Sequence, residues 1–94
     1  MIEWTERAIR QLDQARDYIA LSNSEAVAAR IVMRIAKSVE QLAMFPMSGR
    51  SGRVAGTREL VISNTPFVVA YTMRGDRVVV LAVYHSARQW PQEF

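Results

Sequence analysis

Three apolar runs, rich in β-branched and aromatic residues and separated by turn signals, constrain most strongly what this chain can fold into. The runs are residues 60–62, 67–72 and 78–84. Gly75 and Asp76 stand between the last two runs, where a glycine supplies the positive φ that a two-residue hairpin turn needs. The sequence therefore predicts three antiparallel strands between residues 56 and 91. Because the runs are nearly continuous rather than alternating, we expect one face of the sheet to be covered and the other to be partly shielded.

The first half of the chain carries two amphipathic helical patterns. One is expected over about residues 6–21, after Thr5 at the helix start. Ser22 with Glu25 three residues later matches a capping box, so the second helix should begin almost at once. Its end is expected at residues 45–46, because proline disfavours helix at the residue before it. The short link between the two helices predicts an antiparallel helical hairpin.

The remaining segments complete a predicted α+β fold. Residues 1–4 alternate apolar and polar and are expected to form a short first strand. Residues 47–56, with three glycines, two serines and two arginines, are expected to form a loop. The chain should form a single domain over residues 1–94, in which the helical hairpin covers one face of a three- to four-stranded antiparallel sheet. The other face and the edges of this sheet are expected to stay partly open.

Composition argues against several kinds of site and location. The chain has no cysteine and one histidine, so we expect no disulfide, no metal site and no cofactor. The longest apolar run, residues 78–84, is far shorter than the roughly 20 residues that span a bilayer. Residues 1–4 have no basic stretch and no apolar run behind them, which argues against a signal peptide. We therefore expect a cytoplasmic protein without a membrane partner.

The net charge of +3 lies entirely in the second half of the chain. Residues 1–46 carry six bases and six acids, a balance of zero, whereas residues 47–94 carry six arginines and three acids, a balance of +3. Arginine pairs with carboxylate or phosphate through two hydrogen bonds, so the pattern indicates an anionic partner, either a nucleic acid or an acidic protein segment. The glycine-rich backbone near Arg50 and Arg53 either holds a phosphate or a substrate strand, or is a mobile connector with solvated arginines.

Two residues of the predicted sheet are candidates for chemistry. Arg58 starts a strand beside Glu59, and it either clamps a scissile phosphate or pairs with a glutamate on the surface. His85 ends the last strand, where it either transfers protons or bonds to the backbone. Together they would suit RNA cleavage by attack of a 2′-hydroxyl. Tyr84 and Tyr71 are further proton carriers, although strand alternation puts Tyr84 on the face opposite His85.

The same sheet half is the expected surface for a macromolecular target. Arg88 either extends its basic surface or bonds to the chain end, and Trp90 is the one large apolar anchor of the tail. Trp90 is expected to pack on the domain rather than to stack on a base. The residues predicted to contact the target are Arg50, Arg53, Arg58, Arg88 and Trp90.

Two segments have a distinctive pattern. Residues 56–60 read Gly-x-Arg-Glu-Leu, and residues 85–91 read His-x-x-Arg-x-Trp-Pro. With the helical hairpin before them, they make the chain resemble the RelE/ParE superfamily of bacterial type II toxins over nearly its whole length. The resemblance implies that an antitoxin encoded beside the toxin holds it inactive, with the C-terminal part of the antitoxin wrapped around the helices and the sheet.

Within that superfamily the resemblance implies one of two activities. RelE-like members are ribonucleases that cut messenger RNA, mostly on the ribosome, whereas ParE-like members poison DNA gyrase and have no known catalysis. By position, Arg58 matches a phosphate-binding arginine of the ribonucleases, and His85 matches a catalytic histidine of some of them. The lysines that RelE uses before this arginine are missing here, since Lys37 is in a helix, and Ser86 follows the histidine.

The incomplete catalytic set and the long hairpin resemble ParE more closely than RelE. This resemblance implies DNA gyrase as the target, with the ribosome and messenger RNA as the alternative. It also implies a hetero-oligomer with an acidic antitoxin that folds on binding. In the ParE-like case Arg58 and His85 shape a surface, and they are catalytic only in the ribonuclease case.

Overall fold

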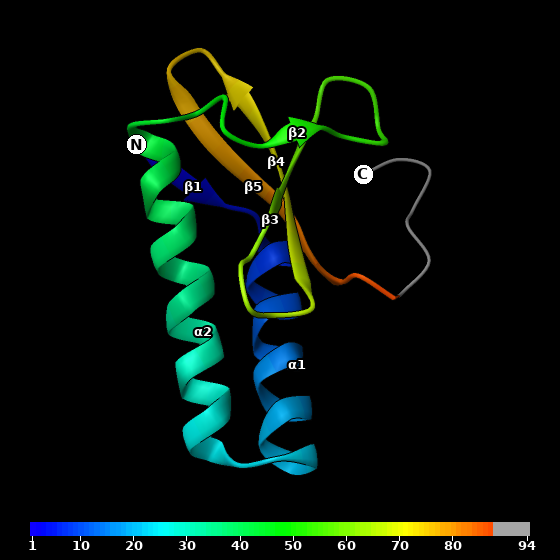
Figure 1. Ribbon diagram of the computed structural model, residues 1–94. Helices are drawn as coiled ribbons and strands as arrows, with labels where there is room; N and C mark the ends of the chain where they lie inside the picture. The colour runs from blue at the N-terminus through cyan, green and yellow to red at the C-terminus, as the bar shows by residue number, and fades with distance from the viewer. Residues whose placement is uncertain (88–94) are drawn as a thin grey trace.

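Residues 1–87 are described by the structure, a computed structural model. They form two helices beside a five-stranded sheet (Figure 1), which confirms the predicted α+β fold class. The strands are β1 (Ile2–Trp4), β2 (Arg50–Ser51), β3 (Arg58–Val61), β4 (Phe67–Arg74) and β5 (Arg77–His85). The helices are α1 (Glu6–Ser22) and α2 (Glu25–Glu40), and a 3₁₀ turn, η1 (Gln41–Ala43), follows α2.

Hydroxyl side chains fix where both helices begin. The Thr5 hydroxyl accepts a hydrogen bond from the Ala8 amide at 3.1 Å and caps α1, as predicted. The cap of α2 is Ser24, whose hydroxyl accepts from the Val27 amide at 3.1 Å. The predicted cap at Ser22 is wrong, because this residue is the last of α1 and its hydroxyl bonds back to the preceding turn of that helix. A cap needs extended backbone, which Ser24 has.

The second helix ends earlier than predicted. The α-helix stops at Glu40 and tightens into η1, after which the Met44 and Phe45 amides both donate to the Gln41 carbonyl, at 3.1 and 2.9 Å. Pro46 restricts the residue before it, but it does not prevent the last turn from tightening into 3₁₀ geometry, which is common at helix ends.

The sheet is mixed rather than wholly antiparallel. Its strand order is β1-β5-β4-β3-β2, with β1 parallel to β5 and the other neighbours antiparallel. Two expectations are therefore corrected. The sheet has five strands rather than three or four, and residues 50–51, expected in a loop, form the edge strand β2. A parallel neighbour requires a long connection, and the chain between β1 and β5 is long enough to provide it.

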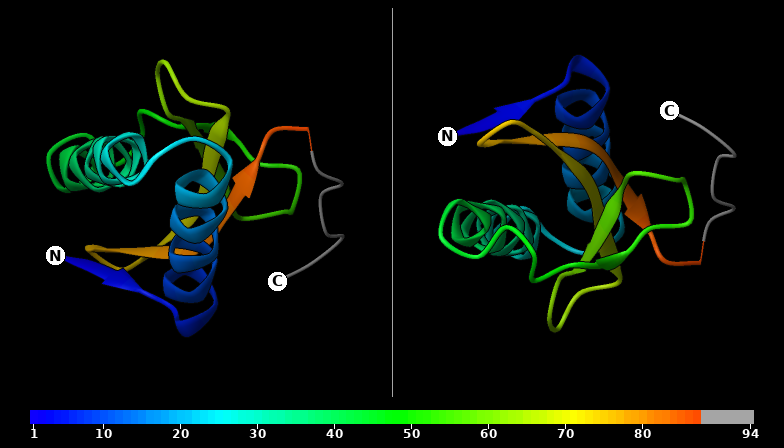
Figure 2. Two further views of the ribbon diagram at one scale, coloured as in Figure 1. Left: turned by 90° about the horizontal axis from the view of Figure 1, so that it is seen from below. Right: turned by 90° about the horizontal axis from the view of Figure 1, so that it is seen from above.

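β4 and β5 form the predicted hairpin. Arg74 pairs with Arg77 across the turn, and Gly75 has a φ of +64°, whereas Asp76 has no positive φ. A positive φ at the first central residue alone is typical of a type II′ turn, whose twist matches that of the strands it joins. A β-bulge farther along this pair adds to the strong twist of the sheet in Figure 2.

One face of the sheet and the two helices enclose the core. Phe67, Val69 and Tyr71 alternate toward this face along β4. The largest fully buried side chains of this core are Tyr71, Ile35, Leu42, Ile62, Val39, Val69, Val78 and Val80. Fully burying one large aliphatic side chain stabilises the fold by roughly 1.5–3 kcal/mol, so this layer is the main source of stability.

The opposite face of the sheet is also buried at its centre. Val68, Ala70, Val79 and Ala82 lie on it, and none is more than 2% exposed. This explains the nearly continuous apolar runs, because strands buried on both faces need not alternate apolar and polar residues. From the sequence, the face of the sheet opposite the helices is expected to stay partly open, but the exposed part of this face is smaller than expected.

Candidate target-binding site

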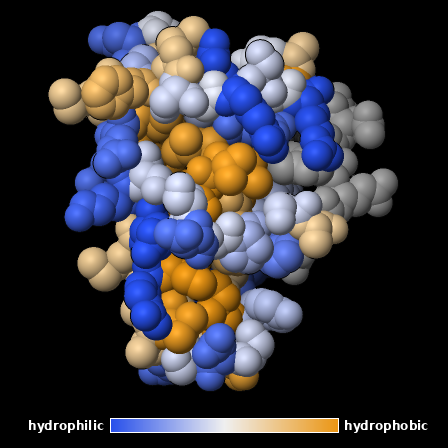
Figure 3. All heavy atoms as spheres, in the orientation of Figure 1, coloured by the Kyte–Doolittle hydropathy of each residue, from blue (hydrophilic) through white to orange (hydrophobic). Residues whose placement is uncertain are grey.

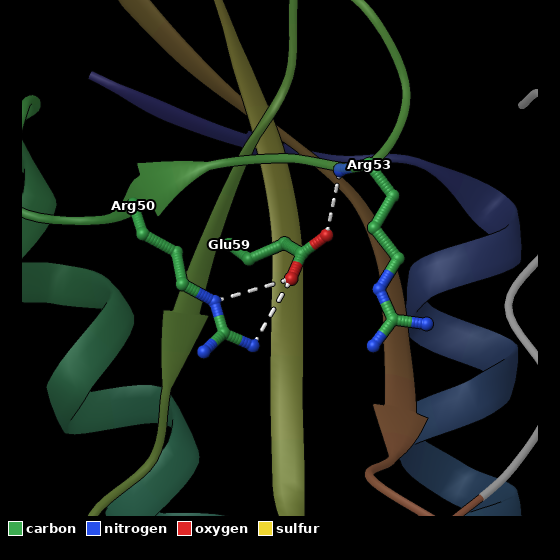
Figure 4. A network of polar contacts seen from close by, with 3 residues as sticks. All are labelled: Arg50, Arg53 and Glu59. Atoms are coloured by element: carbon green, nitrogen blue, oxygen red, sulfur yellow. Dashed lines mark hydrogen bonds and ion pairs between the residues drawn. The ribbon is translucent and has the colours of Figure 1, made fainter.

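A buried carboxylate fastens the loop between α2 and β3 to the sheet. Glu59 is 3% exposed, and its Oε1 accepts hydrogen bonds from Nε and Nη2 of Arg50 at 3.3 and 3.2 Å (Figure 4). Its Oε2 accepts from the backbone amide of Arg53 at 2.9 Å. A carboxylate removed from water needs such partners, because an unpaired buried charge is costly. In Figure 4 the dashed line to Arg53 starts at its backbone nitrogen, so Arg53 contributes its backbone to this network.

Two more side chains of the sheet hold the same loop. The Tyr71 hydroxyl donates to the Pro46 carbonyl at 2.7 Å and accepts from the Gly49 amide at 2.9 Å. Nη1 of Arg58 donates to the Gly49 carbonyl at 2.7 Å and to the Met47 carbonyl at 3.4 Å. A Cβ at position 49 would lie only 2.6 Å from the Tyr71 hydroxyl oxygen, so the loop approaches the sheet as closely as a glycine allows. These contacts favour a fixed surface segment over a mobile connector.

The same contacts bear on the predicted roles of the arginines. The guanidinium group of Arg50 is engaged with a carboxylate, and that of Arg58 with backbone carbonyls. The surface pair that the sequence suggested between Arg58 and a glutamate is not formed among residues 1–87, and the neighbouring Glu59 pairs with Arg50. Contact of Arg50, Arg53 and Arg58 with a target stays a prediction, and a phosphate would have to compete with the partners that Arg50 and Arg58 already have.

His85 lies at the end of β5, beside a cavity of about 370 Å³ between α1 and the β4–β5 pair. Its Nδ1 accepts a hydrogen bond from the Ala87 amide at 3.1 Å, and its ring meets Phe67 edge-on with centroids 5.7 Å apart. In neutral imidazole an accepting Nδ1 leaves the proton on Nε2. To act as a base at Nε2, the ring would have to change tautomer and give up the bond to Ala87.

The sheet register keeps Arg58 and His85 apart. Arg58 pairs with Tyr71 of β4, and His85 pairs with Phe67, so the two candidates lie on one face but four residues apart along β4. At about 3.3 Å per residue and 4.8 Å per strand, their Cα atoms are roughly 16 Å apart. The structure therefore does not bring them together around one phosphate.

Arg7 and Gln11, which the sequence did not single out, meet Tyr84 beside the end of β5. Tyr84 faces away from His85, as predicted, and its phenol lies near Arg7 and Gln11 of α1. Burial raises the pKa of the Tyr84 phenol, and this effect is opposed by the charge of Arg7 and by hydrogen bonds from Gln11 and Arg7. Oε1 of Gln11 also accepts from the Val83 amide at 2.8 Å. The four-residue spacing of Arg7 and Gln11 on one helix face was the available signal.

Two of the residues predicted to contact the target follow the described residues in the chain. Arg88 and Trp90 lie outside the described residues, so their contacts with a target stay predictions. Among residues 1–87 no group of acidic and histidine side chains is arranged to hold a metal ion. Within the same range, neither helix combines the length and the apolar character that a membrane span requires.

Known proteins resemble this chain over nearly its whole length. Residues 2–90 match the family described as the ParE toxin of the type II toxin-antitoxin system, parDE. Y4kP of Sinorhizobium fredii, which carries a provisional toxin name, is 46% identical over 91 residues, covering 97% of this chain and 93% of that protein. Toxin RelE2 of Caulobacter vibrioides is 34% identical over 87 residues, covering 93% and 96%. A chain of the chromosomal ParDE TA system from P. aeruginosa has the same fold, with a TM-score of 0.82 and 24% identity over 89% of this chain and 92% of that one.

Proposed function

We propose that this chain, which belongs to the ParE toxin family of type II toxin–antitoxin systems, acts by binding and inhibiting DNA gyrase. The observation that carries the proposal is the family match, which spans nearly the whole chain. In this account the protein is a binding toxin: its folded surface blocks the target, and no covalent step is required of its side chains.

The geometry of the two candidate catalytic residues supports a binding toxin over a ribonuclease. General acid–base cleavage of RNA needs proton carriers and a phosphate-binding cation within hydrogen-bond reach of one phosphodiester. Arg58 donates to the Gly49 carbonyl, and His85 accepts from the Ala87 amide. By the sheet spacing, the Cα atoms of Arg58 and His85 are roughly 16 Å apart. Both side chains act within the fold in this arrangement, which suits a structural role.

A cognate antitoxin is the second partner in this proposal, and it fits the exposed apolar surface. Two apolar areas face the viewer in Figure 3, one over the helical hairpin and one higher, toward the sheet. Large exposed apolar side chains occur on α1 and after α2, at Ile9, Tyr18, Leu21, Met44, Phe45 and Met47. Free soluble proteins rarely expose wide apolar patches, so a partner that covers this surface is expected. An acidic segment that folds on binding also complements a chain of net charge +3.

A paired assay tests the choice of target. The toxin, purified away from its antitoxin, is added to gyrase with relaxed plasmid and, separately, to ribosomes with messenger RNA. We expect supercoiling to be lost at toxin concentrations that leave the messenger RNA intact. Site-specific cuts in the messenger RNA with full supercoiling activity would refute the gyrase proposal.

Messenger RNA cleavage is the second candidate function, because the similarity to toxin RelE2 favours it. Here His85 would transfer the protons and Arg58 would hold the phosphate, which requires both residues to leave their present partners. The ribonuclease reading therefore predicts that cleavage is abolished by His85→Ala.

A further inference from the structure

Cations that no carboxylate neutralises are concentrated on α2. Arg30, Arg34 and Lys37 follow one another at helical spacings of four and three, so they project from one face of the helix. All three are exposed, and none of them forms an ion pair within residues 1–87. We call them the α2 cation row. They line a shallow hollow of about 360 Å³, whose other lining residues are Met33, Ser38 and Gln41.

The arginines of the sheet half, in contrast, are largely engaged with other groups of the chain. Arg50 pairs with the buried Glu59, and Nη1 of Arg77 pairs with Oε1 of Glu3 at 2.8 Å. Arg58 donates to backbone carbonyls of the preceding loop. By sequence, the whole net positive charge belongs to residues 47–94, but among residues 1–87 the structure shows a row of unpaired positive charges on α2. Hydrophilic side chains cover the left side of Figure 3, where α2 lies.

We infer that the α2 cation row binds the phosphate backbone of duplex DNA. Lys37 lies seven residues after Arg30, so the row extends about 10.5 Å along the helix. Duplex DNA carries one negative charge per roughly 1.7 Å of its axis, so about six phosphates lie within this length. Arginine forks match the phosphate oxygens, and no carboxylate of the protein has to be displaced first.

The surroundings of the row favour DNA over other polyanions. Protein partners bind through large side chains that are desolvated in pockets, whereas the one large apolar side chain that lines this shallow hollow, Met33, is exposed. The major groove of B-form DNA is about 12 Å wide and accepts a helix, whereas the major groove of duplex RNA is too narrow for protein side chains to read. The inference concerns DNA alone, so it does not depend on gyrase being the target.

The test is the anisotropy of a fluorescently labelled 20-base-pair duplex, titrated with the purified toxin at several salt concentrations. Three phosphate contacts predict a slope of about −2.7 in the logarithm of affinity against the logarithm of salt, or roughly 40-fold weaker binding at 200 mM than at 50 mM salt. The triple variant Arg30→Gln, Arg34→Gln and Lys37→Gln should reduce this slope nearly to zero.

A matched variant separates the row from the overall charge. The triple variant Arg10→Gln, Arg16→Gln and Arg74→Gln removes the same number of charges from exposed positions outside the row. We expect this variant to keep the salt dependence of DNA binding that the wild type shows. Equal losses in the two triple variants, a wild-type slope near zero, or equal binding of duplex RNA or of a polyglutamate peptide would each overturn the inference. Amide chemical shifts of the wild-type protein on DNA addition give a second measurement that needs no variant, and they should change along α2.

Discussion

Glu59 and Arg50 form an ion pair with an N–O distance of 3.2 Å, in which the carboxylate is buried and the guanidinium is half exposed. The pair joins β3 to the edge strand β2, and the second carboxylate oxygen holds the backbone that follows. The buried carboxylate of Glu59 therefore needs the exposed guanidinium of Arg50 to neutralise its charge, so a substitution of Glu59 should affect stability.

Glu59→Gln should destabilise the protein by about 2 kcal/mol, which corresponds to a fall in Tm of roughly 10 °C for a domain of this size. The amide NH₂ group of glutamine would face donors from Arg50 or Arg53, so at least one part-buried hydrogen bond to the buried side chain would be lost. Thermal unfolding followed by circular dichroism measures the change. Glu40→Gln is the matched control, because Glu40 is exposed and forms no ion pair among the described residues. If both variants melt together, the pair does not stabilise the fold.

Tyr71→Phe should cost roughly 1–3 kcal/mol, because it leaves the Gly49 amide and the Pro46 carbonyl without their partner inside the protein. The loop should also open more often, so amide exchange at Gly49 should become faster by hydrogen-exchange mass spectrometry. Tyr18→Phe removes the same atom at an exposed site and serves as the control. Unchanged exchange in Tyr71→Phe would contradict the account of the loop as a fixed segment.

The raised pKa of Tyr84 predicts a loss of stability in alkaline solution. The folded state holds the phenolic proton more tightly than the unfolded state, whose phenol titrates near 10.0. Stability from this group is therefore complete below pH 10 and falls as the pH rises through the higher folded pKa. Urea unfolding of wild type and Tyr84→Phe between pH 8 and 12 measures it. The difference in their free energies should be constant up to about pH 10 and shrink above it, and a constant difference throughout would contradict the prediction.

The apolar end of the helical hairpin should contribute to antitoxin binding. Met44 and Phe45 are 79% and 63% exposed, so Met44→Ser with Phe45→Ser should leave the melting temperature nearly unchanged. If the antitoxin covers them, its affinity should fall by at least 30-fold, since buried anchors contribute about 2 kcal/mol or more. Calorimetric titration with the antitoxin measures the effect. Met33→Ser, 71% exposed among the cations of α2, is the control and should bind normally; equal affinities for all three proteins would exclude this surface.

Local patterns were enough to predict most of the fold. The helical periodicity, the Thr5 cap and the two-residue turn at Gly75 depend on neighbours in the sequence, and the structure confirms them. The parallel pairing of β1 with β5 could not be predicted, because three residues carry no reliable period and their partners are more than seventy positions away. The choice between Ser22 and Ser24 as a cap was also ambiguous, since both are serines beside the same short link.

The candidate site was harder to predict, because it depends on register and on burial. The sequence places Arg58 and His85 at strand ends, but their separation follows from how β3 and β5 align on β4. The burial of Glu59 could not be read from its position beside an arginine. Its partner, Arg50, comes from an edge strand of two residues that composition assigned to a loop.

The claim that this toxin acts by binding is tested most directly by measuring the concentration of His85→Ala that halves the supercoiling activity of gyrase. Circular dichroism first confirms that the variant is folded. The account predicts that the variant and the wild type inhibit at the same concentration. It would be contradicted if the wild type left supercoiling intact while cutting messenger RNA, and His85→Ala abolished those cuts.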